Sequence, residues 1–244
     1  MTDLKKVQED GFNLQYIKKQ TPEICIAAVK QEGYALKYVK KQTPEICLAA
    51  VKQEGFAIQY TQKQTPDLCL AAAKANGYAL AYISNQTLEI CLAAVQQDGC
   101  ALQYVKKQSP EICLAAVRQN GYAIEYVRNQ TPEICLAAVK QTGHALQYVK
   151  NQSFEICLAA VKENGYVIEH VRNQTPEICL IAVQRDGGAL YHVKNQTPEI
   201  ILAAVRENKY AFEFVQDQFK FLFNEEYKDL SLNEIKDKVP EMFL

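Results

Sequence analysis

A period of 22 residues runs through almost all of the 244-residue chain, and it constrains the fold more than any other feature. Thr or Ser recurs at one position of the period from Thr21 to Thr197, and Gly recurs at another from Gly11 to Gly187. A fixed period of this kind is typical of tandem-repeat proteins, in which each unit buries its apolar face against its neighbours. We therefore predict a stack of repeats and not one or two globular domains.

The repeats leave little of the chain unassigned. We place ten of them, the first lacking its two opening positions, at residues 1–20, 21–42, 43–64, 65–86, 87–108, 109–130, 131–152, 153–174, 175–196 and 197–218. Residues 219–244 depart from the pattern and begin with several Phe residues. We expect them to form a helical C-terminal cap, in which Ser231 and Glu234 could make a capping box.

Each full repeat carries signals for two short helices. In the repeat at 43–64, Thr43 is a good N-cap, Pro44 suits the first helical position and Glu45 complements the helix dipole. Gly55 predicts the end of that helix in a left-handed conformation. The expected helices are 44–54 and 56–63, which makes the fold class all-α: an α-solenoid, or α-α superhelix, of two-helix repeats. We exclude a leucine-rich repeat fold, because its Leu ladder is missing from the sequence and the Ala-Ala pairs favour helix.

Recurring positions indicate how the repeats stack. Where inner repeats have Cys25, Ala27 and Ala28, the first repeat has polar Asp3, Lys5 and Lys6, so these positions are expected to pack on a preceding repeat. Gln precedes every N-cap, and its amide could satisfy the carbonyls that end the second helix and also bond to the adjoining turn. The alternative is that this Gln ladder contacts a repetitive ligand.

The run Glu-Ile-Cys-Leu-Ala-Ala-Val-Lys/Arg-Gln-x-Gly-x-Ala-Leu-x-Tyr-Val, which recurs through residues 1–218, resembles a family of short helical repeats described only as a domain of unknown function. The resemblance implies a setting in bacteria, including host-associated ones, or in large viruses of amoebae, and it brings no catalytic residues. The connector here, Lys/Asn-Gln-Thr-Pro, differs from the Pro-Glu-rich connector that is usual in that family.

Composition argues against several partners. Lys and Arg number 27 against 28 Asp and Glu, so the net charge gives no case for nucleic acid or an anionic membrane. There is neither an apolar leader at the start nor an apolar run long enough to span a bilayer. With nine Cys and no pairing pattern, we expect a reducing, cytoplasmic compartment, and delivery into a host cell stays open.

Cysteine and histidine do not point to chemistry. Eight Cys share one repeat position, where neighbouring helices are too far apart for disulfides or zinc, so we interpret them as buried filler and expect only Cys100 to be partly exposed. His144, His170 and His192 occupy slots that are aromatic in other repeats. Phosphate loops and nucleophile motifs are missing from the sequence. We expect no enzyme activity, no catalytic residue, no cofactor and no metal site.

The varying positions of the second helices predict where a partner would bind. Two adjacent rows face outward, and we call their central part the binding ribbon: Lys106, Glu125, Arg128, Gln147, Lys150, Glu169, Arg172, Tyr191 and Lys194. Since drift leaves varied polar residues on any surface, a solvated face without function is the alternative. We expect that changing Arg128, Lys150 and Arg172 to Glu weakens a partner and leaves melting nearly unchanged.

These features favour a monomer that acts as a protein- or peptide-binding scaffold, the common use of stacked repeats. Two alternatives stay open. Helical repeats can also read nucleic acid, one base each, but that requires a basic track with exposed stacking rings. The chain could also be a passive spacer.

Overall fold

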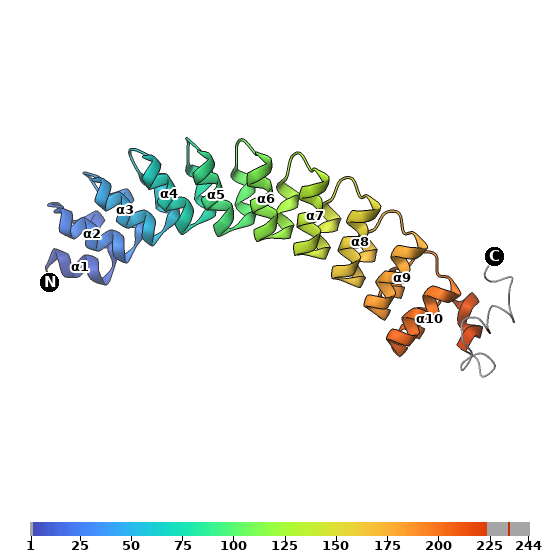
Figure 1. The fold of residues 1–244 in the computed structure, drawn as a ribbon. Helices are drawn as coiled ribbons and strands as arrows, with labels where there is room; N and C mark the ends of the chain where they lie inside the picture. Colours follow the sequence, from blue (N-terminus) through green and yellow to red (C-terminus); the bar gives the residue numbers. More distant parts are fainter. Residues whose placement is uncertain (1, 224–233, 235–244) are drawn as a thin grey trace. The chain divides into compact units, whose positions relative to one another are not determined.

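The computed structural model describes residues 2–223 and residue 234, and over these residues it contains helices and no strand (Figure 1). The chain forms two compact units, Met1–Asn129 and Gln130–Leu244. Within each unit, every repeat is one short α-helix followed by one 3-10 helix, and α-helices of neighbouring repeats pack side by side. This confirms the prediction of an all-α repeat solenoid. Each α-helix begins directly after a Thr or Ser.

The helices of the first unit are α1 (Asp3–Glu9), η1 (Gly11–Tyr16), α2 (Pro22–Gln31), η2 (Gly33–Tyr38), α3 (Pro44–Gln53), η3 (Gly55–Tyr60), α4 (Pro66–Ala75), η4 (Gly77–Tyr82), α5 (Leu88–Gln97), η5 (Gly99–Tyr104), α6 (Pro110–Gln119) and η6 (Gly121–Tyr126). Those of the second unit are α7 (Pro132–Gln141), η7 (Gly143–Tyr148), α8 (Phe154–Glu163), η8 (Gly165–His170), α9 (Pro176–Arg185), η9 (Gly187–His192), α10 (Pro198–Glu207), η10 (Lys209–Phe214) and η11 (Asp217–Phe223).

The α-helices begin as the sequence predicts. Thr175, for example, lies in extended conformation, and its hydroxyl accepts a hydrogen bond of 3.3 Å from the backbone N–H of Ile178. Pro176 takes the first helical position, where its missing N–H breaks no helical bond. Glu177 lies in the first turn, at the positive end of the helix dipole.

The second helix of each repeat is a six-residue 3-10 helix, and the prediction of a longer helix at 56–63 was wrong. In the repeat at 43–64 it is η3, Gly55–Tyr60, and the N–H of Thr61 bonds to the carbonyl of Ile58 three residues back. The side chain of the residue before the Gly often caps the start of this 3-10 helix. The side chain of Asn76, for instance, accepts from the N–H of Tyr78 at 3.0 Å. Such side-chain caps favour a short, tight turn over a longer α-helix.

The recurring glycines are needed for close packing and not for a left-handed backbone, so that part of the prediction was also wrong. Among the described residues none has a positive φ, glycines included. Instead, a Cβ at Gly33 would lie 2.8 Å from the carbonyl oxygen of Ala50, and one at Gly165 would lie 2.5 Å from that of Ala182. Each Gly therefore lets its 3-10 helix approach the backbone of the next repeat's α-helix.

The core of each unit lies between neighbouring repeats. Ala28, Val29 and Leu36 of the second repeat are fully buried, and their counterparts repeat this along the stack. The ladder cysteines are only 2–6% exposed. In the first repeat, Asp3 and Lys6 are exposed at the corresponding positions. This agrees with the expectation that the Cys and Ala positions pack on a preceding repeat.

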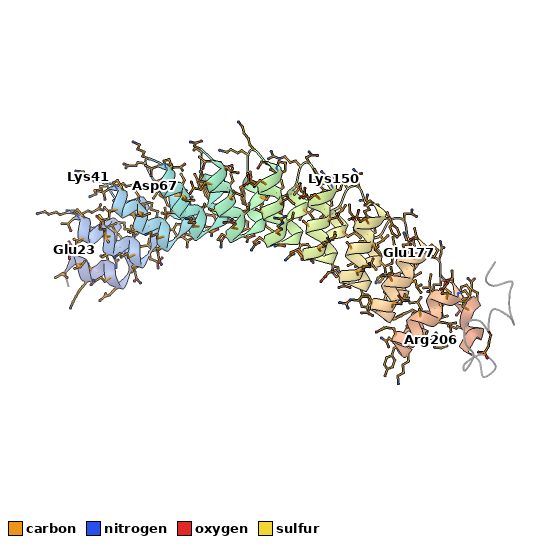
Figure 2. The ribbon with its side chains drawn as sticks, in the orientation of Figure 1. Glu23, Lys41, Asp67, Lys150, Glu177 and Arg206 are labelled. Atoms are coloured by element: carbon orange, nitrogen blue, oxygen red, sulfur yellow. The ribbon has the colours of Figure 1, made fainter. Side chains whose placement is uncertain are left out.

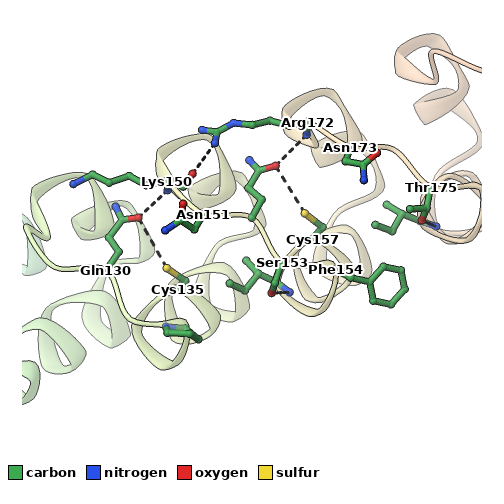
Figure 3. A pocket seen from close by; sticks show the side chains of 14 residues that line it. Gln130, Cys135, Lys150, Asn151, Ser153, Phe154, Cys157, Arg172, Asn173 and Thr175 are labelled. Atoms are coloured by element: carbon green, nitrogen blue, oxygen red, sulfur yellow. Dashed lines mark hydrogen bonds between the residues drawn. The ribbon is translucent and has the colours of Figure 1, made fainter.

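The Gln before each N-cap joins successive repeats through its side-chain amide, as its structural interpretation predicted. Gln152 donates from Nε2 to the carbonyls of Leu146, at 3.3 Å, and His170, at 3.0 Å. Its Oε1 accepts from the backbone N–H of Arg172 at 3.0 Å and lies 3.8 Å from the thiol of Cys157 (Figure 3). One amide thus bonds to the end of its own 3-10 helix and to the end of the next.

The predicted C-terminal cap is described only at its start. Phe219, within η11, is 7% exposed and therefore packs into the second unit. Ser231 and most of residues 219–244 lie outside the described residues, so the proposed capping box remains a prediction.

Replacing Gly165 by Ala tests the close-packing role of the glycines. The added Cβ would meet the carbonyl oxygen of Ala182 at 2.5 Å, so the two helices must separate, and we expect a loss of about 1–3 kcal/mol in unfolding free energy. Urea unfolding followed by circular dichroism measures it. The control is Gly188→Ala, where the obstruction is the movable end of the Tyr166 side chain. Equal stability of the two variants would contradict the close-packing role.

Replacing Gln152 by Ala tests the amide bridge. Three hydrogen bonds, two to carbonyls and one from a backbone N–H, would be lost at once, and at about 1 kcal/mol for each neutral hydrogen bond we expect a loss of about 2–4 kcal/mol. The matched control is Gln147→Ala in the same repeat, because the exposed Gln147 amide has one hydrogen bond, to the carbonyl of His144. A loss no greater than that of the control would show that the bridge does not hold the repeats.

Candidate interaction surface

All nine residues of the binding ribbon are exposed. Lys106, Glu125 and Arg128 belong to the first unit, and the other six belong to the second. They come from two repeat positions, one on the outer side of the 3-10 helix and one just after its end. In the second unit, the first position gives Gln147, Glu169 and Tyr191, and the second gives Lys150, Arg172 and Lys194. Lys150 projects outward at the edge formed by the connecting loops (Figure 2).

The basic row also has a structural role that the sequence did not reveal. Arg172 donates from its two terminal nitrogens to the carbonyls of Lys150, at 2.6 Å, and Val149, at 3.2 Å, in the preceding repeat. Arg128 makes the equivalent bonds to Lys106 and Val105, at 2.9 and 3.3 Å. Each guanidinium therefore binds two carbonyls at the end of the 3-10 helix in the preceding repeat, and we call this contact a clasp.

These clasps correct the expected effect of charge reversal. A Glu at position 128 or 172 could not donate to the carbonyls that now accept from Arg, and its carboxylate would repel them. Changing Arg128, Lys150 and Arg172 to Glu would therefore lower the melting temperature, so any effect on a partner could not be separated from damage to the stack. A Gln keeps a donor: Gln216 lies 3.5 Å from the carbonyl of Lys194 at the same repeat position.

The aromatic slots form a row of edge-to-face pairs between neighbouring repeats. In the first unit, Tyr34 and Tyr60 pair with ring centroids 6.1 Å apart. In the second unit, histidines continue the row, and His144 and His170 pair at 5.9 Å. The rings thus contact one another edge to face.

Glu169 contacts two of the histidines, which the sequence did not reveal. Its carboxylate oxygens lie 3.2 Å from Nε2 of His170 and 3.9 Å from Nε2 of His192. The ring of Tyr191 packs edge to face on His192, with centroids 4.9 Å apart. In the part of the chain that the structure describes, however, no group of three or more His, Cys, Asp or Glu side chains is arranged to hold a metal ion.

Cys100 differs from the ladder cysteines. It is partly exposed, as predicted, and its sulfur accepts a hydrogen bond of 3.4 Å from the amide of Asn120. Burial raises the pKa of its thiol, and the carboxylates of Asp98 and Glu125 raise it further. Burial likewise raises the pKa of the ladder thiols. Within the described residues, no thiol is therefore a strong nucleophile near neutral pH.

Sequence reasoning missed a groove along the loop edge of the second unit. Its lining includes Lys150 and Arg172 from the ribbon, together with Asn151, Asn173 and Phe154 (Figure 3). A signal was present, because Phe154 breaks the recurring Thr-Pro pattern at the start of α8.

Comparison with known proteins identifies the repeats. A family model described as a domain of unknown function, DUF4116, matches residues 4–43, 22–64, 87–130, 131–174 and 175–220. Each match spans about two neighbouring repeats. No curated protein and no solved structure matches the chain. No helix within residues 2–223 is long and apolar enough to cross a membrane.

Chemical labelling tests the exposure of the thiols. At pH 8 we expect iodoacetamide to modify Cys100 before the ladder cysteines, but slowly, because its raised pKa keeps the thiolate fraction low. The rate should increase as the pH rises through 9 and above. Glu125→Gln removes one of the charges that raise this pKa and should increase the rate at pH 8. Mass spectrometry of peptides locates the label, and equal early labelling of all nine thiols would contradict the burial of the ladder.

Proposed function

We propose that this chain, which belongs to the DUF4116 family, is a non-enzymatic scaffold that binds a protein or peptide through the binding ribbon. We further propose that it acts as a monomer in a reducing, cytoplasmic compartment, which suits its nine unpaired thiols. The observation that carries the proposal is the division between recurring and varying positions. The recurring Gln, Gly, Cys and Thr positions contact neighbouring helices or cap them, whereas the outer positions of the 3-10 helices vary and are exposed.

A protein or peptide suits this surface better than nucleic acid does. On the ribbon of the second unit, Lys150, Arg172 and Lys194 lie beside Glu169, so the row is not uniformly basic. Binding to a phosphate backbone is driven by many cations that replace counterions, and acidic side chains oppose it. Tyr191, 66% exposed, gives the ribbon an aromatic residue of the type enriched at protein interfaces.

Photo-crosslinking tests the ribbon. A benzoylphenylalanine at position 147 faces the ribbon, and one at position 162 lies on the exposed side of α8. In an extract of the source cell, we expect a discrete protein to crosslink from position 147 and not from 162. The purified partner should then bind the unlabelled chain in a titration.

A matched pair of variants checks that result with residues that other repeats already hold at the same positions. The double variant Glu169→Gln and Tyr191→Gln installs the residue found at this repeat position in Gln59, Gln103 and Gln147, and we expect it to weaken the partner at least fivefold. Lys162→Gln, the residue found at Gln96 and Gln184, should leave affinity unchanged. If the double variant binds as tightly as the original chain, the ribbon is not the binding face.

A further inference from the structure

The groove along the loop edge of the second unit has the size and lining of a ligand site. It encloses about 570 Å³, which is within the usual range for bound ligands. Its lining includes the apolar side chains of Pro132, Ile156 and Ile178. The ladder thiols of Cys135 and Cys157 also line it (Figure 3). The amides of Asn151 and Asn173, one from each repeat, lie along its edge.

The charge of this groove is positive. Lys150 and Arg172 are the charged residues among its lining, and none of its lining residues is acidic. Their backbone N–H groups bond to the amide bridges of Gln130 and Gln152, and the Arg172 guanidinium is held by two carbonyls. Those two bonds use two of the five N–H groups of Arg172. The positive charge of the Arg172 guanidinium is therefore held in position at the groove.

Two grooves at corresponding places in the first unit lack this character. At the repeat position of Lys150 and Arg172, one of them has the neutral side chains of Gln62 and Ser84. The other is lined by Glu45 and Asp67 as well as by Lys63. A basic pair recurs at this repeat position in Lys106 and Arg128, but a basic lining is not a consequence of the repeat itself.

Phe154 is a second local departure. Where the neighbouring helices α7 and α9 begin with Pro132 and Pro176, α8 begins with Phe154, whose side chain is 45% exposed at the groove. Contact between an exposed aromatic ring and water is unfavourable. Covering the ring with an apolar side chain of a partner would therefore favour binding.

We propose that this groove binds an extended peptide segment that carries acidic residues flanking an apolar one. The carboxylates pair with Lys150 and Arg172, the apolar side chain packs on Phe154, and the backbone of the segment bonds to the amides of Asn151 and Asn173. The inference rests on the proposed peptide-binding function and names its partner class and its position. An extended strand suits the groove because it presents backbone donors and acceptors along its length, as the repeated amides require.

The probe is a library of fluorescein-labelled decapeptides with two Asp or Glu residues on each side of a central Leu, Phe or Ile. A matched library has Lys at every acidic position. Fluorescence anisotropy with the full chain measures affinity at physiological salt. We expect binders in the acidic library and at least tenfold weaker binding in the basic one. Equal binding of both libraries, or of neither, would overturn the proposal.

Variants that imitate other repeats test the site without threatening the fold. Lys150→Gln with Arg172→Gln installs the residue of Gln62 and Gln216, and we expect it to weaken the best acidic peptide at least tenfold. Phe154→Pro restores the residue that begins α7 and α9, and we expect at least a threefold loss. The control is Leu88→Pro, the same restoration in the first unit, which should leave affinity unchanged. Circular dichroism melts confirm that each variant is folded. Unchanged affinity in both groove variants would refute the site.

Two further experiments distinguish this inference from the proposed function and from simple charge attraction. A labelled oligothymidylate of ten nucleotides that binds as tightly as the best peptide would show a polyanion site and overturn the peptide assignment. If a captured protein partner is weakened by Glu169→Gln with Tyr191→Gln but not by Phe154→Pro, the scaffold function stands and the groove inference fails. If Phe154→Pro weakens it and Glu169→Gln with Tyr191→Gln does not, the groove inference stands and the ribbon row that holds Glu169 and Tyr191 is not the binding face.

Discussion

The side-chain amide of the Gln before each N-cap is the contact on which the stacked repeats depend. The 3-10 helix that ends each repeat is only six residues long, and its last carbonyls cannot be satisfied by a further turn. Gln174 bonds through Nε2 to the carbonyls of Ile168 and His192, each at 3.0 Å, and through Oε1 to the backbone N–H of Lys194 at 2.9 Å. A carboxylate could not donate and an ammonium could not accept, so neither could replace the amide, which bonds to both repeats from one side chain.

The period of 22 residues follows from this bridge together with the glycine contact. The bridge fixes the end of one 3-10 helix against the end of the next, and Gly165 brings the start of η8 against the carbonyl of Ala182 in α9. Adding a residue to the 3-10 helix would move one of these contacts away from the other. Short helices of this kind are marginal in water, so they are stable only where neighbouring repeats bury their apolar faces.

Sequence alone predicted the repeat, the starts of the α-helices, the buried cysteine ladder and the role of the Gln, because each depends on a residue type that recurs with the period. It failed where the physical cause lies in the neighbouring repeat. The need for Gly33 comes from close contact with the following repeat, in particular with the carbonyl of Ala50, which no propensity encodes. The clasp of Arg172 on the carbonyl of Lys150 spans 22 residues, so Arg172 was interpreted as purely a surface charge.

The same contacts between repeats explain why the side chains at the loop edge can vary while the repeats stay stacked. At the position of Lys150, the junction uses the backbone N–H, which bonds to Oε1 of Gln130, and any residue except Pro provides that group. At the first position of each α-helix, the backbone N–H is not used by the helix, so Pro is favoured there without being required, and Leu88 and Phe154 are accepted. Charge and aromatic area can therefore change at this edge one repeat at a time. A positive groove with an exposed ring at one junction, and neutral or partly acidic grooves at others, is the kind of local difference that selective binding requires and that the stacking contacts themselves do not produce.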